Sequence, residues 1–381
     1  MSRKHALVFS GGGSYGAYAV GVTKALAAQG EVFPEILIGT SSGGFNATFL
    51  ASRWREGLPT AAAALEAVWT KIFAGSMSLG TNGVFRFRGN PFEVFSQRGL
   101  RHPWKIFNRW LTDGTHITGQ TFNRAQWLLR GRRNEAFSVR LAAMADISAF
   151  ISMQPMQHSI RRVINFHRLR DFPYDLGVVV TDFHSGKLVL FDQRSMKPEV
   201  GHKYIMASAA IPGIFPPVQC EGRWFVDGGV LYQTPILPAV QQGAEVIHAV
   251  ELFPRIDQIP PAPLGNTPDA MLRTQMISDQ QILSSLLRDL SFYNGLMRNS
   301  STLGEQMGED DWAKAFTQRF QFISRGRQLT VHRYFPSDFV GSHPMEMLNF
   351  SPSHVGRLIE MGIADTRAHS CKKNGCVLPF E

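Results

Sequence analysis

The stretch Glu35-Ile-Leu-Ile-Gly-Thr-Ser41-Ser-Gly-Gly44 decides how the chain is expected to fold. Its apolar start predicts a buried β-strand, its glycines predict a tight turn, and a helix is expected from there to about Arg55. The same order precedes it, with a strand over 5–9, a glycine turn over 11–13 and a helix over about 14–29. Strand, helix and strand in succession imply a right-handed crossover and a parallel sheet. The sequence therefore predicts an α/β fold.

Similar signals continue along the chain. Further strands are expected over 176–180, 187–191, 246–250 and 328–335, and further helices over 60–73, from Thr267 and from Ser351.

The pentapeptide Gly39-Thr-Ser41-Ser-Gly43 has the form G-x-S-x-G. This pattern is common by chance, so its position between a strand and a helix is the evidence. A nucleophile elbow holds its serine in a strained backbone conformation, and small residues on either side let strand and helix approach closely. We therefore predict Ser41 as a nucleophile; the alternative is a serine- and glycine-rich turn without chemistry.

A second glycine turn reads Gly11-Gly12-Gly13-Ser-Tyr-Gly16 and fits the dinucleotide template G-x-G-x-x-G. That template requires an acidic residue at the end of the next strand, where this chain has the Ser41 turn instead. Three consecutive glycines can aim several backbone N–H groups at one point, as an oxyanion hole requires. Oxyanion stabilisation by Gly11, Gly12 and Gly13 is thus favoured over phosphate or dinucleotide binding.

A serine nucleophile needs a base, and Asp227 in Phe225-Val-Asp227-Gly-Gly229 is the candidate. The glycines permit a turn that could hold its carboxylate against the serine, although a plain Asp-Gly turn is the alternative. A Ser…Asp…His order would nominate a later histidine as third partner. The histidines after Asp227 are His248, His332, His343, His354 and His369, and no motif singles one out.

Four motifs in this order and spacing resemble the patatin-like phospholipases. They are Gly11–Gly16, Gly39–Gly43, Ala207–Pro217 and Asp227–Gly229. The match is good over about 5–55 and 175–255 and faint elsewhere. The resemblance implies a three-layer α/β/α sandwich with a mostly parallel central sheet. It also implies a catalytic pair without histidine, Ser41 as nucleophile and Asp227 as general base, with the oxyanion hole at Gly11, Gly12 and Gly13. The supporting glycines of these motifs are Gly16, Gly39, Gly43, Gly228 and Gly229.

The implied activity is that of a lipid acyl hydrolase, a phospholipase A-type esterase that cleaves fatty acyl esters through a serine acyl-enzyme without cofactor or metal. Alternatives are an acyltransferase, an esterase for neutral lipids or lysophospholipids, and a catalytically silent lipid-binding protein. The chain departs from the family at Tyr15, where Arg or Lys is usual. A tyrosine brings no charge for a lipid phosphate, which leaves neutral acyl esters open as substrates.

Residues 75–136 read as an irregular insertion that could form a cap. Between Phe85 and Trp110 the cations are Arg86, Arg88, Arg98, Arg101, Lys105 and Arg109, opposed only by Glu93, and the aromatic residues are Phe85, Phe87, Phe92, Phe95, Trp104, Phe107 and Trp110. Such a mixture suits contact with an anionic membrane, or equally a small cap core with solvated arginines outside. We expect a catalytic domain over 5–255 and a C-terminal helical extension over 256–381 packed on the same domain.

Composition bounds the remaining possibilities. The 381 residues are 44% hydrophobic and 18% charged, which excludes a disordered chain, and 39 basic against 30 acidic residues give a net charge of +9. No nucleic-acid recognition motif accompanies this charge, so an acyl-ester lipid is the expected partner rather than a nucleic acid.

Three cysteines, Cys220, Cys371 and Cys376, are too few for a disulfide framework and indicate a reducing compartment. Cys371 and Cys376 are interpreted as part of an ordinary tail without neighbouring histidines, and no metal site is expected. The glycines at 11–13 interrupt the apolar N-terminal run, so a secretory signal is not predicted. The expected location is the cytoplasm; the sequence leaves open both membrane association and export as an effector.

Overall fold

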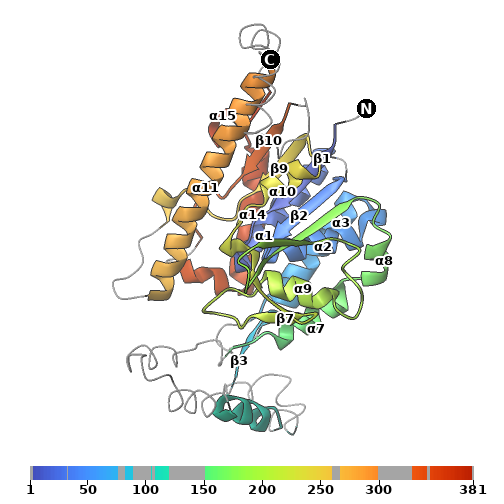
Figure 1. The fold of residues 1–381 in the computed structure, drawn as a ribbon, viewed down its shortest axis with the longest axis vertical. Coiled ribbons are helices and arrows are strands. Elements are labelled where there is room, and N and C mark those ends of the chain that lie inside the picture. The colour runs from blue at the N-terminus through green and yellow to red at the C-terminus, as the bar shows by residue number, and fades with distance from the viewer. Residues whose placement is uncertain are drawn as a thin grey trace.

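A central β-sheet organises the molecule (Figure 1). The computed structural model describes residues 3–31, 33–75, 82–88, 104, 108–119, 151–259, 267–298, 328–340 and 344–379. The sheet has eight strands in the order β10-β9-β1-β2-β5-β8-β7, and β6 also pairs with β5. Five of them are mutually parallel: β1 (His5–Phe9), β2 (Ile36–Thr40), β5 (Asp175–Asp182), β9 (Val246–Val250) and β10 (Thr330–Tyr334). Three run antiparallel to their neighbours: β6 (Leu188–Phe191), β7 (Val218–Cys220) and β8 (Arg223–Asp227). The predicted mostly parallel sheet is confirmed.

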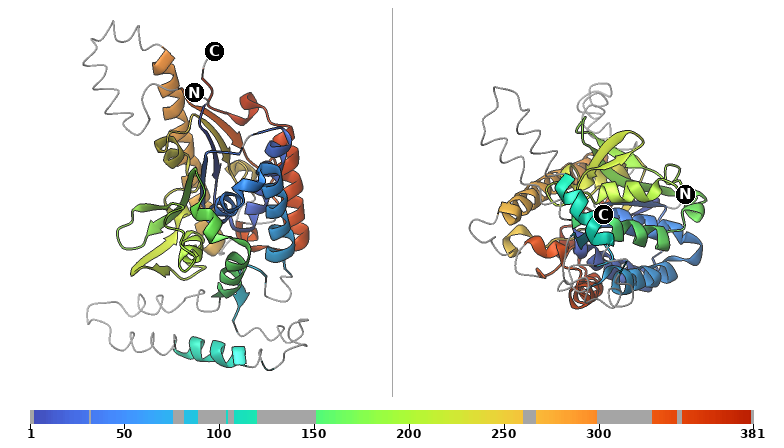
Figure 2. Two further views of the ribbon diagram at one scale, coloured as in Figure 1. Left: turned by 90° about the vertical axis from the view of Figure 1, so that its right-hand side faces the viewer. Right: turned by 90° about the horizontal axis from the view of Figure 1, so that it is seen from below.

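Successive side chains on a strand point to opposite faces of the sheet, so the strands contribute to two separate hydrophobic cores. In β1, Leu7 and Phe9 pack with one set of helices, whereas Ala6 and Val8 pack with the other. On the first face lie α1 (Gly16–Ala28), α2 (Ser42–Ser52), α3 (Leu58–Val68), α9 (Gly201–Ser208) and α14 (Pro352–Arg367). On the second lie α10 (Ile236–Gln241) and most of the core residues of α11 (Thr267–Arg298). Figure 2 shows the sheet between the two helical layers, which is the predicted three-layer sandwich.

Shorter elements complete the described chain. They are helices α7 (Gln154–Val163), α8 (Phe166–Arg170) and α15 (Cys371–Asn374), single helical turns at Gly13–Tyr15, Trp54–Glu56, Gly228–Val230, Ile256–Gln258 and Pro344–Leu348, and a separate strand pair, β3 (Arg86–Phe87) with β4 (Ile151–Ser152). The helix predicted over 60–73 is α3 followed by a wider π-helical turn, Trp69–Phe73.

Only part of the basic and aromatic insertion is described. Arg86 is buried and makes two hydrogen bonds to the Asp113 carboxylate, at 2.7 and 2.9 Å, so this cation does not face a membrane. Phe85 belongs to the main hydrophobic core, whereas Trp104 is 70% exposed. The other predicted contributors Phe92, Glu93, Phe95, Arg98, Arg101, Lys105 and Phe107 lie outside the described residues. Neither the membrane contact nor the cap core is decided by the described part, and both stay predictions.

The C-terminal stretch is built into the same layers. β10 extends the sheet beside β9, and α14 packs along α1. The two helices meet backbone to backbone, because a Cβ at Gly362 would overlap the carbonyl oxygen of Tyr18 and one at Gly21 would overlap that of Ile359. The division of the chain near residue 255 remains a prediction. No described helix is long and apolar enough to cross a bilayer.

The α1–α14 crossing predicts a position-specific loss of stability. Gly362→Ala should lower the free energy of unfolding by about 1–3 kcal/mol, because the added methyl group forces the two backbones apart. Gly356→Ala in the same helix is the control: nothing lies within 4 Å of its added Cβ, and alanine favours helices over glycine by up to about 1 kcal/mol. Urea denaturation measures both, and equal stability of the two variants would contradict the close crossing.

Candidate active site

Ser41 occupies the turn between β2 and α2 with φ 55° and ψ −124°, a backbone conformation that costs a non-glycine residue about 1–3 kcal/mol. The first residues of α2 fold back against the end of β2, so that a Cβ at Gly39 would overlap the Gly43 carbonyl group. A Cβ at Gly43 would in turn lie 2.5 Å from the carbonyl oxygens of Phe9 and Ser10. The glycines of the motif thus allow the sharp turn that presents the Ser41 side chain.

Ser208, at the end of α9, holds this turn in place. Its Oγ accepts a hydrogen bond from the Ser41 amide at 2.8 Å and donates one to the Val179 carbonyl at 2.6 Å. It lies in the segment 207–217 that supports the family resemblance, yet no role for it was apparent from the sequence. Only the fold shows that a serine 167 residues away closes the strained turn.

Asp227 lies at the end of β8, opposite Val180 of β5. Its main chain is fixed twice, since its amide donates to the Ala210 carbonyl at 3.0 Å and its carbonyl accepts from the Thr181 hydroxyl at 3.1 Å. Asp227 is 5% exposed; its carboxylate accepts a hydrogen bond from the Gly229 amide at 2.7 Å and lies close enough to the Ser41 side chain for that hydroxyl to lower its pKa. The predicted pair is therefore brought together.

Burial dominates the electrostatics of this carboxylate. Removal from water raises the pKa of Asp227 to about 7, and the hydrogen bond from Gly229 and the nearby Ser41 hydroxyl offset only part of that rise. A carboxylate with this pKa is partly protonated near neutrality, and its affinity for a proton suits general-base chemistry better than that of an exposed aspartate.

The three glycines at 11–13 lie beside Ser41 but are not equivalent. The Gly11 amide donates to the Gln233 carbonyl at 3.1 Å, and the Gln233 side chain donates back to the Gly11 carbonyl at 2.6 Å. The Gly11 N–H is therefore already hydrogen-bonded, whereas the sequence predicted that all three amides would donate to one oxyanion. Within the described ranges the amides of Gly12 and Gly13 have no hydrogen-bond acceptor.

Gly13 must be glycine here. It has φ 57°, and a Cβ would overlap the Met347 carbonyl oxygen. The other motif glycines also mark close approaches: a Cβ would meet Ser42 at Gly16, the Val179 carbonyl at Gly228 and the Gln233 side chain at Gly229.

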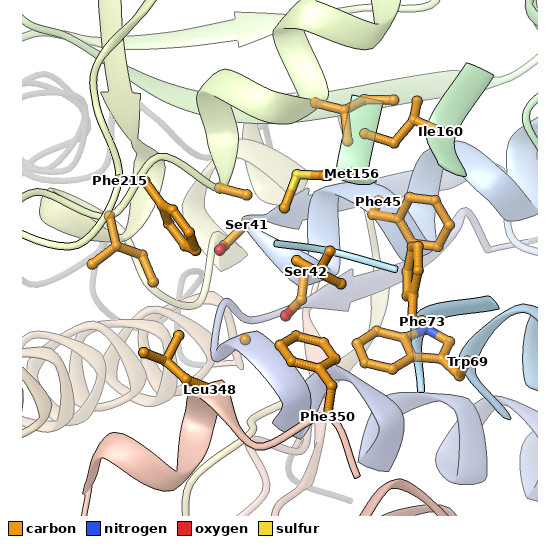
Figure 3. Close-up of a pocket in the computed structure, with 15 residues that line it drawn as sticks. Ser41, Ser42, Phe45, Trp69, Phe73, Met156, Ile160, Phe215, Leu348 and Phe350 are labelled. Carbon is orange, nitrogen blue, oxygen red and sulfur yellow. The ribbon is translucent and has the colours of Figure 1, made fainter. Parts of the chain in front are cut away.

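Two cavities meet at Ser41. The first, about 540 Å³ out to its open mouth, is lined almost entirely by apolar side chains (Figure 3). Around it lie Phe45, Trp69, Phe73, Met156, Ile160, Ile205, Ala209, Phe215, Leu348 and Phe350. The second, about 430 Å³, adds polar groups, which are those of Asp227, Gln233, Gln275 and Asp279. Ser41 and Ile211 line both cavities, so the serine stands at the boundary between an apolar and a polar chamber.

Asp279, Gln275 and Gln233 were not predicted at the site. Asp279 and Gln275 come from α11, a helix predicted without any functional residue, and Gln275 donates to the Gly229 carbonyl at 2.6 Å. Burial and the negative charge of Asp227 raise the pKa of Asp279 to about 7. The sequence signal for α11 was only its helical start, and nothing in it indicates which face meets Asp227.

Tyr15 points away from the site. It is fully buried, its hydroxyl donates to the Val340 carbonyl at 2.7 Å, and its ring packs against Phe253, Phe339 and His354. It therefore offers neither charge nor a hydrogen bond to a substrate.

Among the described histidines none lines either cavity. His354 lies near the Ser14 hydroxyl, 3.3 Å away, and His248 and His332 stack on neighbouring strands. His343 is outside the described residues.

The interpretation of Cys371 and Cys376 as thiols without neighbouring histidines is wrong. The structure gathers both with His332 and His369 into one group. His332 approaches from β10 through the fold, a contact that its distance in sequence conceals. His369 stands only two residues before Cys371, and that spacing was a signal the sequence did contain.

The raised pKa of Asp227 predicts a pH-dependent gain of stability on its removal. Its pKa is about 7 in the folded protein and about 4 when unfolded, so folding stability falls as the pH rises from about 4 to about 7. Asp227→Asn should therefore stabilise the protein by up to about 4 kcal/mol at pH 8, a gain that shrinks toward pH 4. Urea denaturation at several pH values measures this.

The exposed Asp171 provides the control, and Asp171→Asn should change stability by less than about 0.5 kcal/mol throughout. A difference between Asp227→Asn and the wild type that is the same at pH 4 and pH 8 would contradict the raised pKa.

Known proteins can now be compared with this geometry. The family model "Patatin-like phospholipase" matches residues 7–240. Uncharacterized NTE family proteins of Mycobacterium bovis and Mycobacterium tuberculosis are 25% identical over 139 residues, which cover 36% of this chain and 37% of theirs. The chain thus matches little more than a third of the length of these curated relatives. The crystal structure of VipD from Legionella pneumophila aligns over 97% of this chain and 66% of its own, with TM-score 0.39 and 13% identity. Since the family model covers more than half of the chain, the chain belongs to the patatin-like phospholipase family.

Proposed function

We propose that the protein hydrolyses fatty acyl esters of lipids through an acyl-enzyme formed on Ser41. The observation that carries this proposal is that Ser41 lines both cavities and shares the polar one with the buried Asp227. An ester needs one space for its acyl chain and another for its alcohol, with the nucleophile between them. Family membership supports the same class of reaction.

In the proposed reaction Asp227 accepts the Ser41 proton as the hydroxyl attacks the ester carbonyl. The amides of Gly12 and Gly13, rather than that of Gly11, donate to the tetrahedral oxyanion. Collapse expels the alcohol, which takes the proton from Asp227. Water then attacks the acyl-enzyme and gives its proton to Asp227, which returns that proton to Ser41 Oγ as the bond to the acyl group breaks and the fatty acid leaves.

The apolar cavity is the proposed site of the acyl chain. Each methylene group transferred from water to such a surface contributes about 0.8 kcal/mol to binding. The polar cavity then receives the alcohol part of the substrate and the hydrolytic water.

The charges around the polar cavity favour a substrate whose alcohol part is uncharged, which is a second and narrower proposal. No Lys or Arg is among the described residues that line either cavity, whereas Asp227 and Asp279 both line the polar one. A phosphate group there would meet carboxylates without a compensating cation. We therefore favour esterase activity on neutral acyl esters over phospholipids, whose head groups carry a phosphate.

Ser41→Ala should abolish both acyl release and covalent labelling by a fluorophosphonate probe, because the nucleophile is gone. Ser42→Ala removes the neighbouring hydroxyl and should leave labelling intact. Asp227→Asn should lower the rate by about 100-fold or more, because the base is lost. Acyl release is measured on a panel of phospholipids, lysophospholipids and neutral glycerides, with and without a lysolipid acceptor to separate hydrolysis from acyl transfer. Wild-type rates in Ser41→Ala would refute the assignment, and an unlabelled wild type would favour a silent lipid-binding protein.

The acyl cavity can be tested by narrowing it. Ala209 lines it, and Ala209→Leu should reduce kcat/KM for long-chain esters at least tenfold more than for butyryl esters, because only long chains need the filled volume. Ala63→Leu on the exposed face of α3 is the control and should change neither rate. An equal loss for short and long chains would place the acyl chain elsewhere.

A further inference from the structure

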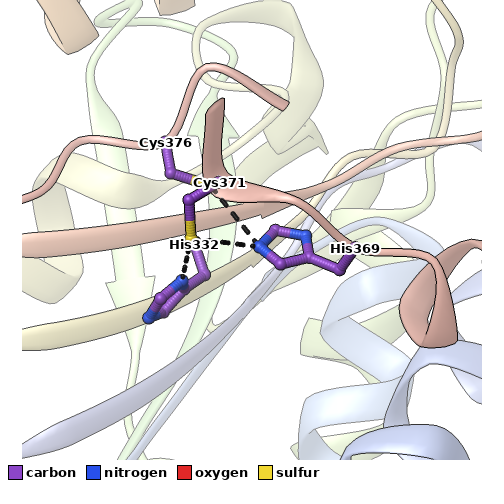
Figure 4. A group of neighbouring side chains, drawn as sticks. All are labelled: His332, His369, Cys371 and Cys376. Atoms are coloured by element: carbon purple, nitrogen blue, oxygen red, sulfur yellow. Dashed lines mark hydrogen bonds between the residues drawn. The ribbon is translucent and has the colours of Figure 1, made fainter. Parts of the chain in front are cut away.

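Four side chains with metal-binding atoms converge away from Ser41, near the C-terminal end of the chain (Figure 4). His332 comes from β10, His369 follows the end of α14, Cys371 is the first residue of the one-turn helix α15, and Cys376 follows that helix. Their nearest ring-nitrogen and sulfur atoms all lie within 4.8 Å of one another. All four residues are partly buried.

The separations match those within a tetrahedral metal site. Cys371 Sγ lies 3.4 Å from His332 Nδ1 and 3.5 Å from His369 Nε2, and Cys376 Sγ lies 3.6 Å from His369 Nε2. With zinc–sulfur bonds of about 2.3 Å and zinc–nitrogen bonds of about 2.0 Å, a tetrahedron places sulfur and nitrogen about 3.5 Å apart. Three edges of the polyhedron are therefore already at the required length.

The backbone around the cysteines is shaped to hold both sulfurs on one side. The Cys376 amide donates to the Cys371 carbonyl at 3.0 Å, and Gly375 between them has φ 62°. The Arg333 amide donates to Cys376 Sγ at 3.3 Å, the kind of outer hydrogen bond that orients a thiolate ligand. The next residue, Val377, pairs with Val331 through two backbone hydrogen bonds, at 2.7 and 3.0 Å.

We propose that His332, His369, Cys371 and Cys376 bind one structural zinc ion. Two cysteines with four residues between them and two histidines form one of the common ligand sets of structural zinc, and mixed sulfur and imidazole ligands favour zinc over magnesium or calcium. Binding replaces the two thiol protons, which pass to solvent, so two thiolates balance the charge of the ion. All four positions are taken by protein, which makes the site structural rather than catalytic. The ion joins β10, the end of α14 and the C-terminal turn.

Two alternatives, one within this group and one beside it, have signatures of their own. Cys371 and Cys376 could form a disulfide, which would consume both thiols without metal. A neighbouring trio, His5, Glu31 and His248, could bind a cation with no sulfur at all. Removal of either cysteine leaves that trio intact, so a cysteine variant separates the two sites.

The test uses the full chain, purified with a phosphine reductant and without a polyhistidine tag. Stripped wild-type protein is incubated with zinc, freed of excess ion and analysed by mass spectrometry for metal. We expect one zinc per chain in the wild type and in Cys220→Ala, which removes the buried thiol of β7 outside the cluster. Cys371→Ala, Cys376→Ala and His369→Ala should each lose at least nine-tenths of the bound zinc.

Two further measurements keep the proposal testable where a variant folds poorly. Cobalt(II) added to stripped wild type should give sulfur-to-metal charge transfer and the strong visible bands of tetrahedral coordination. Zinc should also raise the melting temperature of the wild type and of Cys220→Ala, but not of Cys371→Ala/Cys376→Ala. A wild type that binds no zinc, full zinc retention without both cysteines, or a Cys371–Cys376 disulfide that persists in reductant would overturn the proposal.

Discussion

The left-handed backbone of Ser41 is the constraint on which the site depends. That conformation turns the side chain out of the sheet, and it persists because the surrounding structure leaves the residue no relaxed alternative. The Ser41 amide donates a hydrogen bond to Ser208 Oγ, and the first residues of α2 pack closely against Gly39. Asp227 adds a second cost, because a carboxylate is held out of water beside the hydroxyl. The fold thus loses stability at two residues that are neighbours in space, the predicted nucleophile and the predicted base.

Local patterns predicted the fold well where neighbouring residues in sequence decide the structure. β1 and β9 have the expected limits, and the elbow lies between β2 and α2 as its glycines indicated. Ser41 and Asp227 could be paired because each stands in its own turn motif. The predictions were weaker where contacts join distant segments. The Gly11 amide, which was expected to donate to an oxyanion, donates to the Gln233 carbonyl instead. Asp279 lies at the site because α11 packs there, and His332 lies beside the cysteines because β10 does. No single sequence window contains those contacts, since topology alone creates them.

Polarity is divided between the two faces of the nucleophile. Aromatic rings line the apolar cavity, whereas both carboxylates and both glutamines line the polar cavity. Burial raises the pKa of both carboxyls, and the charge of Asp227 raises that of Asp279 further, because like charges in a shared, poorly hydrated space repel each other. Position 15, where a basic residue could have compensated the carboxylates, is instead occupied by Tyr15, which packs in the hydrophobic core. Among the described residues that line the two cavities, the charged side chains are therefore all acidic.

The walls around Ser41 come largely from beyond the four motifs. Leu348 and Phe350, immediately before α14, close one side of the acyl cavity, and Leu272, Gln275, Met276 and Asp279 of α11 close the polar one. A fragment cut after residue 255 would keep all four motifs, including Ser41, Asp227 and the glycines at 11–13. It would nevertheless lose the α11 side of the polar cavity and the Leu348 and Phe350 side of the apolar one. The motifs therefore supply the residues at the centre of the site, whereas part of its enclosure comes from a stretch that carries none of them.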